Sequence, residues 1–531
     1  MDTHALRNGA FAAALALTMT LLPNARAGDQ VRIDSGLIEG AGADAAGIRA
    51  FKGIPFAAPP VGELRWQAPH PVAAWEGVRG ATEFGPRPMQ QYIYSDMIFR
   101  DPGPGEDCLY LNVWTPAKSA GERLPVMVWI FGGGYQAGAT SEPRQDGKDL
   151  ARKGVVVVSM NYRLGIFGFF SHPGLSQESG HGSSGNYGIM DQTAALRWVQ
   201  RNIAAFGGDP SNVTIFGESA GSYSVSVQMA TPLARGLFQK AIGESGSLLG
   251  TRRNPSHVAS LAAAEKAGDE FGASLGAKTI AQLRAIPADA LLKAAADKKF
   301  KVGVVVDGYV LPKDIRSIYE AGEQAHVPLL AGWNADESRV YSVFGDKRPT
   351  AASFIKDVKA EYGAEAGQVL KLYPAGTDEQ AVRSAGDLAG DRFIISTTWK
   401  WIELQLETGN APVYRYQFDR AVPIPPGTVI NGAPATSADT GAPHAWEISY
   451  VFGAISAMKD VPWDAADFRI SDAIGTYWTN FAKTGNPNGG GLPEWPRYEG
   501  QTGRQVMHLD VTLRPEPEAF RERHEYWDSA P

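Results

Sequence analysis

The chain has 531 residues, of which 44% are hydrophobic and 20% charged, a composition typical of a globular protein with a large core. Its net charge of −7 and its pI near 5.8 argue against a nucleic-acid-binding protein, which needs a basic surface. The single cysteine, Cys108, excludes an intramolecular disulfide and a metal cluster held by cysteines.

The N-terminal segment 1–27 has the pattern of an export signal. Arg7 supplies a positive charge, Ala10–Pro23 is an apolar stretch too short to cross a bilayer, and Ala25–Ala27 fits the A-x-A cleavage pattern. A membrane anchor is the alternative for this segment. No later stretch has the roughly 18 unbroken apolar residues of a membrane span. We therefore expect a periplasmic or secreted protein with no membrane attachment after signal cleavage.

Short apolar runs alternate with longer helical patterns along the rest of the chain. The predicted strands are Val31–Gly36, Leu109–Pro116, Pro125–Phe131, Gly154–Tyr162, Asn212–Gly217, Lys240–Ser245, Val327–Asn334 and Val413–Phe418. Several are apolar throughout, as expected for strands that are covered on both faces. Between them, Gly188–Phe206 has apolar residues at near-helical spacing. This alternation predicts an α/β fold in which helices flank a large, mostly parallel sheet.

The alanine-rich segment Ala259–Lys299 predicts helices, which we interpret as an insertion beside the sheet that forms part of a cap. No repeat period is visible, and no linker divides the chain. We therefore predict one domain over residues 28–531.

The segment Thr214–Gly221, TIFGESAG, contains the pattern G-x-S-x-G around Ser219. A predicted strand precedes this serine and a predicted helix follows it, which is the context of a nucleophile elbow. The similar serines Ser245 and Ser184 lack the second glycine of the pattern. An ordinary glycine turn is the alternative interpretation of Ser219 when this motif is taken alone.

A glycine run upstream supplies the backbone amides that such a nucleophile needs. The stretch Trp129–Gly138 leaves an apolar strand and enters three successive glycines. In α/β-hydrolases a run of this kind forms part of the oxyanion hole, and the amide after the serine, here that of Ala220, completes it. A dinucleotide-binding loop is the rival interpretation, but no convincing helix follows and no acidic residue ends the next strand.

The base and the acid are expected after the serine, because this fold class has the order Ser, Asp or Glu, His. The histidines that follow Ser219 are His257, His326, His444, His508 and His524. Of these, His444 ends a long loop of small residues, whereas the last two are expected in a charged C-terminal tail. For the acid, Asp336 and Glu337 both follow a predicted strand, and their spacing does not distinguish them.

Six segments together resemble the type-B carboxylesterase family, the carboxylesterase and cholinesterase branch of the α/β-hydrolases. They occur in family order and are Phe51–Pro69, Glu106–Pro116, Asn161–Phe169, Gly185–Gln192, Phe206–Ser222 and Gly441–Gly453. The resemblance implies an α/β-hydrolase fold, a large mixed and mostly parallel sheet flanked by helices, with helical cap insertions.

The resemblance also assigns the site residues. It implies that Ser219 is the nucleophile, His444 the base and Glu337 the acid. The implied oxyanion-hole amides are those of Gly133, Gly134 and Ala220.

Further residues take supporting roles by the same resemblance. It implies an ion pair between Arg65 and Glu106, a hydrogen bond from Ser245 to the acid, and a structural role for Glu218. Two departures from the family pattern concern Cys108 and Phe131. The usual cysteine partner of Cys108 is replaced by Met89, which implies a free, buried thiol. Phe131 stands where many members have histidine.

We therefore predict a serine hydrolase that cleaves small-molecule carboxylic esters through an acyl-enzyme, with no metal and no cofactor. A non-catalytic adhesion relative and a hydrolase of amides, thioesters or lactones are the alternatives. The sequence does not determine the oligomeric state or the ester. It also leaves open whether Tyr92, Tyr94, Tyr135 and Trp446 line a substrate pocket or belong to the core.

Overall fold

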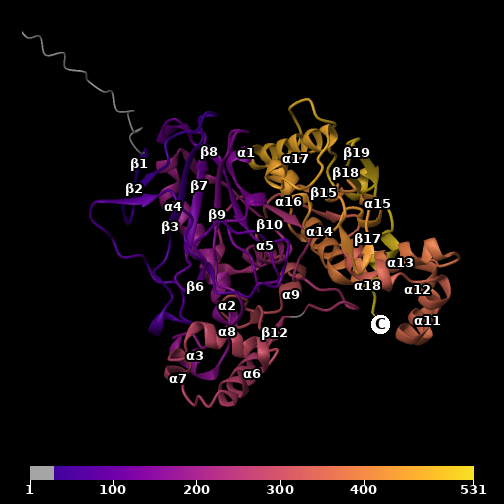
Figure 1. The fold of residues 1–531 in the computed structure, drawn as a ribbon, viewed down its shortest axis with the longest axis horizontal. Coiled ribbons are helices and arrows are strands. Elements are labelled where there is room, and N and C mark those ends of the chain that lie inside the picture. The colour runs from indigo at the N-terminus through magenta and orange to yellow at the C-terminus, as the bar shows by residue number, and fades with distance from the viewer. Residues whose placement is uncertain (1–28, 257, 531) are drawn as a thin grey trace, which may run out of the picture.

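The computed structural model describes residues 29–256 and 258–530, so the predicted export signal and His257 lie outside the described residues. A ten-stranded sheet runs through the molecule between layers of helices (Figure 1). Its strand order is β19-β18-β15-β14-β11-β10-β8-β9-β7-β3. In chain order these strands are β3 Arg49–Pro55, β7 Tyr110–Thr115, β8 Leu124–Ile130, β9 Val156–Met160, β10 Gly208–Glu218, β11 Lys240–Glu244, β14 Leu329–Asn334, β15 Val413–Phe418, β18 Gln505–Leu509 and β19 Arg514–Pro517.

The centre of this sheet is parallel and its two edges are antiparallel. Parallel pairing runs without a break from β9 through β8, β10, β11, β14 and β15 to β18. The strands β3, β7 and β19 pair antiparallel. All residues of β9, β11 and β14 are buried, because helices cover both faces. The predicted helix-flanked and mostly parallel sheet is confirmed.

A smaller sheet lies at the N-terminal end of the described chain. It contains β1 Asp29–Ile33, β2 Gly36–Gly40 and β4 Val78–Ala81. The predicted strand Val31–Gly36 is therefore wrong at its end, because the chain turns after Ile33 and returns antiparallel as β2. Three two-residue pairs complete the strands: β5 Arg87–Pro88 with β6 Pro104–Gly105, β12 Ala259–Ser260 with β13 Val305–Val306, and β16 Val429–Ile430 with β17 Ala433–Pro434.

Helices follow most of the strands and pack on the sheet. They are α1 Lys148–Ala151, α2 Gly165–Phe169, α3 Pro173–Glu178, α4 Tyr187–Asn202, α5 Ala220–Ala230, α6 Leu261–Ser274, α7 Ile280–Arg284, α8 Ala288–Asp297, α9 Ile315–Glu320, α10 Arg339–Ser342, α11 Ala351–Tyr362, α12 Ala366–Leu372, α13 Asp378–Gly390, α14 Ser396–Thr408, α15 Ser437–Thr440, α16 Glu447–Val451, α17 Ala465–Thr484 and α18 Arg521–Asp528. The helices predicted before and after Ser219 are found as α4 and α5.

Two groups of helices stand beside the sheet (Figure 1). The segment Ala259–Lys299 forms α6, α7 and α8, so the predicted helical insertion is confirmed and consists of three helices. The parallel pairing of β12 with β13 joins the beginning and the end of this insertion. The helices α11, α12 and α13 form the second group, which has a small core of its own around Phe354, Val369 and Tyr373.

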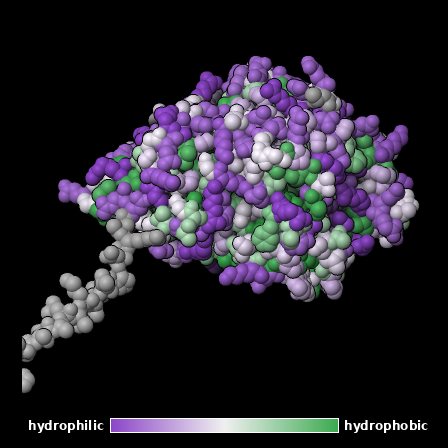
Figure 2. Space-filling model, turned by 90° about the horizontal axis from the view of Figure 1, so that it is seen from above, coloured by the Kyte–Doolittle hydropathy of each residue, from purple (hydrophilic) through white to green (hydrophobic). Residues whose placement is uncertain are grey.

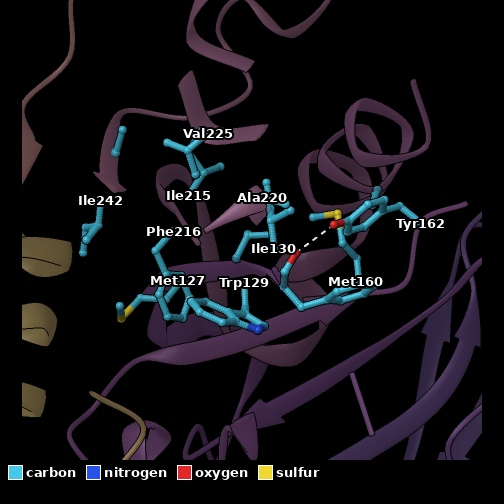
Figure 3. Packing of buried hydrophobic residues seen from close by; sticks show 14 of the residues in the cluster. Met127, Trp129, Ile130, Met160, Tyr162, Ile215, Phe216, Ala220, Val225 and Ile242 are labelled. Atoms are coloured by element: carbon cyan, nitrogen blue, oxygen red, sulfur yellow. Dashed lines mark hydrogen bonds between the residues drawn. The ribbon is translucent and has the colours of Figure 1, made fainter. Parts of the chain in front are cut away.

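The main core packs directly beneath the residues that follow β8 and β10 (Figure 3). Ile130, Ile215 and Ala220 are fully buried there. The hydroxyl of Tyr162 donates a 2.8 Å hydrogen bond to the carbonyl of Phe131, which fixes the start of the glycine run against this core. The loops that follow these strands therefore rest on a rigid base.

The molecular surface is mainly hydrophilic on the face shown in Figure 2, with hydrophobic residues in scattered groups. Tyr92, Ile93, Tyr94 and Ile98 are exposed hydrophobic residues of one loop. Over the described residues, no helix has the length and apolar character that crossing a membrane requires.

Candidate active site

Ser219 occupies a sharp turn between β10 and α5. The strand ends at Glu218, the helix begins at Ala220, and the serine has φ 53° and ψ −120°. An L-residue with these angles costs about 1–3 kcal/mol, and such strain is concentrated at functional sites. Two backbone hydrogen bonds hold the turn: the Ser219 amide donates to the carbonyl of Glu244 at 2.9 Å, and the Tyr223 amide donates to the carbonyl of Ser219 at 2.8 Å.

Glycines allow the backbone to approach this turn closely. A Cβ atom on Gly221 would lie 1.9 Å from the carbonyl oxygen of Ile130, so a side chain has no room between the helix and β8. A Cβ atom on Gly132 would lie 3.0 Å from the Cβ of Ser219. The glycine run after β8 is therefore in direct contact with the serine.

Three backbone amides near the serine have no acceptor among the described residues. They belong to Gly133, Gly134 and Ala220, and none of them donates a hydrogen bond to another described group. Gly133 and Gly134 have φ values of 107° and 62°, in the region that favours glycine. Ala220 is the first residue of α5, whose N-terminal amides also attract negative charge.

His444 and Glu337 form a close pair on the loops that follow β14 and precede α16. The Nδ1 atom of His444 donates to Oε2 of Glu337 at 2.6 Å. The other oxygen of Glu337, Oε1, accepts from the hydroxyl of Ser245 at 2.6 Å and from the amide of Asn334 at 2.8 Å. The hydrogen bond expected from Ser245 is therefore confirmed. Together with the Asn334 amide, it fixes the orientation of the Glu337 carboxylate towards the imidazole.

Asp336, the neighbouring acidic residue, points elsewhere. Its Oδ2 accepts from the amide of Ala442 at 3.0 Å, two residues before His444. Its Oδ1 lies 3.3 Å from Arg339 and 3.2 Å from Arg383. Asp336 thus holds the loop that carries the histidine, whereas Glu337 contacts the histidine itself.

Glu218 approaches the other nitrogen of the imidazole. Its Oε1 lies 3.1 Å from Nε2 of His444, and its side chain is 3% exposed. The hydroxyl of Ser219 makes no hydrogen bond within the described part of the chain, so the structure brings His444 to Glu337 and Glu218 but does not bond it to Ser219. The sequence interpretation missed this contact with Glu218. Its signal was an acidic residue directly beside the candidate nucleophile.

Buried carboxylates dominate the electrostatics of the site. Burial lowers the pKa of His444, but the charges of Glu218 and Glu337 outweigh it and raise that pKa to about 9. Burial raises the pKa of Glu218 to about 8, against the opposing effect of His444. Burial also raises the pKa of Glu447 to about 7, and Glu337 adds to this shift. The site therefore favours a positive charge on the imidazole.

The other described histidines downstream of Ser219 do not reach this site. His326 is exposed and bonds to the carbonyl of Gly322. The prediction of a charged C-terminal tail is wrong for the last two histidines, because His508 lies in β18 beside Asp419 and His524 is buried in α18. The chain there pairs with the sheet and fills the core instead of remaining in solvent.

A cavity of about 620 Å³, here called the large cavity, lies next to the glycine run and the serine helix. Its lining includes Gly134, Tyr135, Tyr223, Leu248, Lys301 and Phe393. The ring of Phe393 also meets His444 edge-on, with centroids 5.0 Å apart. Of the four aromatic residues left open by the sequence, Tyr135 lines this cavity, Tyr92 and Tyr94 are exposed, and Trp446 is half-buried.

Apart from Glu218, the supporting residues implied by the resemblance are found as expected. Arg65 forms a bidentate ion pair with Glu106 at 2.6 and 2.7 Å. Cys108 is a free cysteine and 1% exposed, and Met89 is buried as well. Among residues 29–256 and 258–530, no group of three or more His, Cys, Asp or Glu side chains is arranged to hold a metal ion.

The fold and these loops define the class of protein. A mostly parallel sheet that carries a serine turn after one strand, an acid after a later strand and a histidine after the next is an α/β-hydrolase. The model of the carboxylesterase family matches residues 27–527, so the chain belongs to the carboxylesterase family and is a serine hydrolase of carboxylic esters.

Individual relatives agree with this assignment. The fumonisin B1 esterase of Sphingopyxis macrogoltabida is 36% identical over 91% of this chain and 88% of its own length. The para-nitrobenzyl esterase of Bacillus subtilis is 36% identical over 89% of this chain and 94% of its own. A crystal structure of a Geobacillus stearothermophilus carboxylesterase superposes with a TM-score of 0.78 at 33% identity, covering 94% of this chain and all of that one.

Proposed function

We propose that Ser219, His444 and Glu337 are the catalytic triad of this esterase. The observation that carries the proposal is the 2.6 Å bond between Nδ1 of His444 and Glu337, whose second oxygen is held by Ser245 and Asn334. A carboxylate bound in this way keeps the proton on Nδ1, so that Nε2 of the neutral imidazole can accept one.

The reaction begins when the Ser219 hydroxyl attacks the ester carbonyl and gives its proton to Nε2 of His444. In structures without substrate such contacts are often loose and tighten when substrate binds, which fits a serine hydroxyl without a hydrogen bond. The imidazolium formed in this step is stabilised by Glu337 and Glu218, the two carboxylates that raise the His444 pKa to about 9.

The amides of Gly133, Gly134 and Ala220 would bind the negative oxygen of the tetrahedral intermediate. All three lack another acceptor among the described residues, so the developing charge does not compete with an existing bond. Removing one such donor from a serine hydrolase costs about 10²–10³ in kcat. His444 then protonates the departing alcohol, which leaves the acyl group on Ser219. Water next attacks this acyl-enzyme and gives a proton to His444, which returns it to Ser219 as the acid is released.

Substitution of the nucleophile tests the proposal. Ser219→Ala is expected to lower kcat on a simple activated ester by several orders of magnitude, as in other serine hydrolases. Near-full activity of this variant would overturn the assignment. Amides, thioesters and lactones tested on the same two proteins would show whether the triad favours another acyl compound over esters.

The substrates we propose are small-molecule esters, as implied by the named esterases among the relatives and by the size of the large cavity. We also propose that segment 1–27 directs export to the periplasm or beyond, on the pattern of its sequence. N-terminal sequencing of the protein from the periplasmic and culture fractions tests this. An N-terminus at residue 28 is expected, and an intact leader would refute it.

A further inference from the structure

The segment Lys299–Val305 comes directly after the helices of the insertion, and its residues 300–305 line the large cavity. It follows α8 and ends in β13, whose pairing with β12 closes the insertion. Phe300, Lys301 and Val302 line the large cavity and also a second cavity of about 600 Å³. A substrate group that fills either space therefore meets this short stretch of chain.

Among the described residues, the charged side chains that line the two cavities are all lysines. They are Lys301 in the large cavity and Lys299 with Lys301 in the second one. Asp297 is the acidic residue nearest to these lysines in the sequence, and it forms a 2.5 Å ion pair with Lys293. No described carboxylate lies within ion-pair distance of either lysine. This positive lining stands out in a chain with a net charge of −7.

Two other polar side chains of the large cavity, Ser247 and Thr397, are already engaged. The hydroxyl of Ser247 donates to the carbonyl of Thr397 at 2.7 Å, and the Thr397 hydroxyl donates to the carbonyl of Ile394 at 3.0 Å. The ammonium group of Lys301 has three donors and makes no hydrogen bond within the described part of the chain. Lys301 is exposed and is the one charged side chain among the described residues that line this cavity, so it is the strongest partner there for an anion.

We propose that Lys301 is a specificity-determining residue that selects esters carrying a carboxylate remote from the scissile bond. The proposal rests on the proposed function, since it needs the reacting carbonyl at Ser219. Separation of the two groups is required because Lys301 lines the large cavity, whose lining residues do not include Ser219 or His444. A carboxylate directed to Lys301 gains an ion pair there.

Matched pairs of esters separate charge from shape. In the first pair, the carboxylate is on the acyl side: the para-nitrophenyl monoester of glutaric acid is compared with para-nitrophenyl valerate. In the second pair it is on the alcohol side: the butyrate ester of para-hydroxyphenylacetic acid is compared with that of its carboxamide. Each ester is assayed with the unmodified protein, Lys301→Met, Lys301→Arg and Lys298→Met. Lys298 is the control because it is exposed and lies directly before this segment but lines neither cavity.

For at least one pair, Lys301→Met should raise KM for the carboxylate ester about fivefold, the upper value for an exposed ion pair, and leave kcat unchanged. The KM for the neutral ester should be unaffected. Lys301→Arg should keep the KM of the unmodified protein for the carboxylate ester, and Lys298→Met should have no effect on either KM. The pair that responds identifies the side that carries the carboxylate.

Three results would overturn the proposal: equal losses on both members of each pair, no change on any carboxylate ester, or the same effect from Lys298→Met. Failure of the proposed function has a different outcome, since Ser219→Ala would then keep its activity on the neutral esters as well.

Discussion

Replacing Glu337 by glutamine changes one atom of the proposed triad and preserves its size. The amide nitrogen would take the place of Oε2, which now accepts from Nδ1 of His444 at 2.6 Å. Because an amide nitrogen donates, Nδ1 would have to accept, and the imidazole proton would move to Nε2. This nitrogen could then no longer take the proton of Ser219.

The reverse orientation of the glutamine side chain is blocked by its surroundings. It would direct the amide nitrogen at the Asn334 amide, a donor that now lies 2.8 Å from Oε1. Two donors facing each other in a buried site are unfavourable. The wrong tautomer in a serine triad lowers kcat by about 10⁴, and we expect a loss of this size for Glu337→Gln.

The assay is the hydrolysis of para-nitrophenyl acetate, with urea unfolding to establish that the variant is folded. Asp336→Asn is the matched control, because Asp336 contacts Arg339, Arg383 and the backbone of Ala442 rather than the imidazole. This control should stay within about tenfold of the unmodified enzyme, as expected for a group acting through another. A Glu337→Gln enzyme of near-normal activity, or the larger loss in Asp336→Asn, would show that Glu337 is not the acid of the triad.

With the His444 pKa at about 9, kcat/KM should rise with pH from neutrality towards about pH 9, since only the neutral imidazole is a base. Glu218→Gln removes the carboxylate 3.1 Å from Nε2, which should lower the pKa and move this acid limb down by about one pH unit; an unmoved limb would contradict the contact. Burial raises the pKa of the Cys108 thiol, so thiol reagents should label it only in denaturant, and rapid labelling of the native protein would argue against a buried thiol. Arg65→Met leaves the Glu106 carboxylate without its bidentate partner and should lower the free energy of unfolding in urea by about 3–5 kcal/mol; an unchanged midpoint would show that the ion pair does not stabilise the fold.

The centre of the fold could be predicted from the sequence because its strands are buried on both faces. Runs such as Gly154–Tyr162 are apolar throughout, and the structure places β9 within that stretch. The edges were harder to predict. Val31–Gly36 is interrupted by a turn at Asp34, and the strand that carries His508 is short and mixed in polarity, so neither has a clear periodic pattern.

The site could be predicted only as far as local motifs extend. The turn at Ser219 and the glycine run are contiguous stretches with their own sequence patterns. The acid is different, because Asp336 and Glu337 are adjacent and only their directions in space distinguish them. The contact of Glu218 with His444 joins residues far apart in the chain, so the acidic residue beside Ser219 does not by itself identify its partner.

In the proposed mechanism, Ser219 becomes acylated during ester hydrolysis. An organophosphonate that carries a para-nitrophenyl leaving group reacts as an ester does but leaves a stable adduct on the nucleophile. Intact-mass measurement after incubation should show one added phosphonyl group, and peptide mass spectrometry should locate it on Ser219 in the sequence TIFGESAG. The Ser219→Ala protein should remain unlabelled. An adduct on another residue, or an inhibited enzyme without an adduct on Ser219, would show that Ser219 is not the nucleophile.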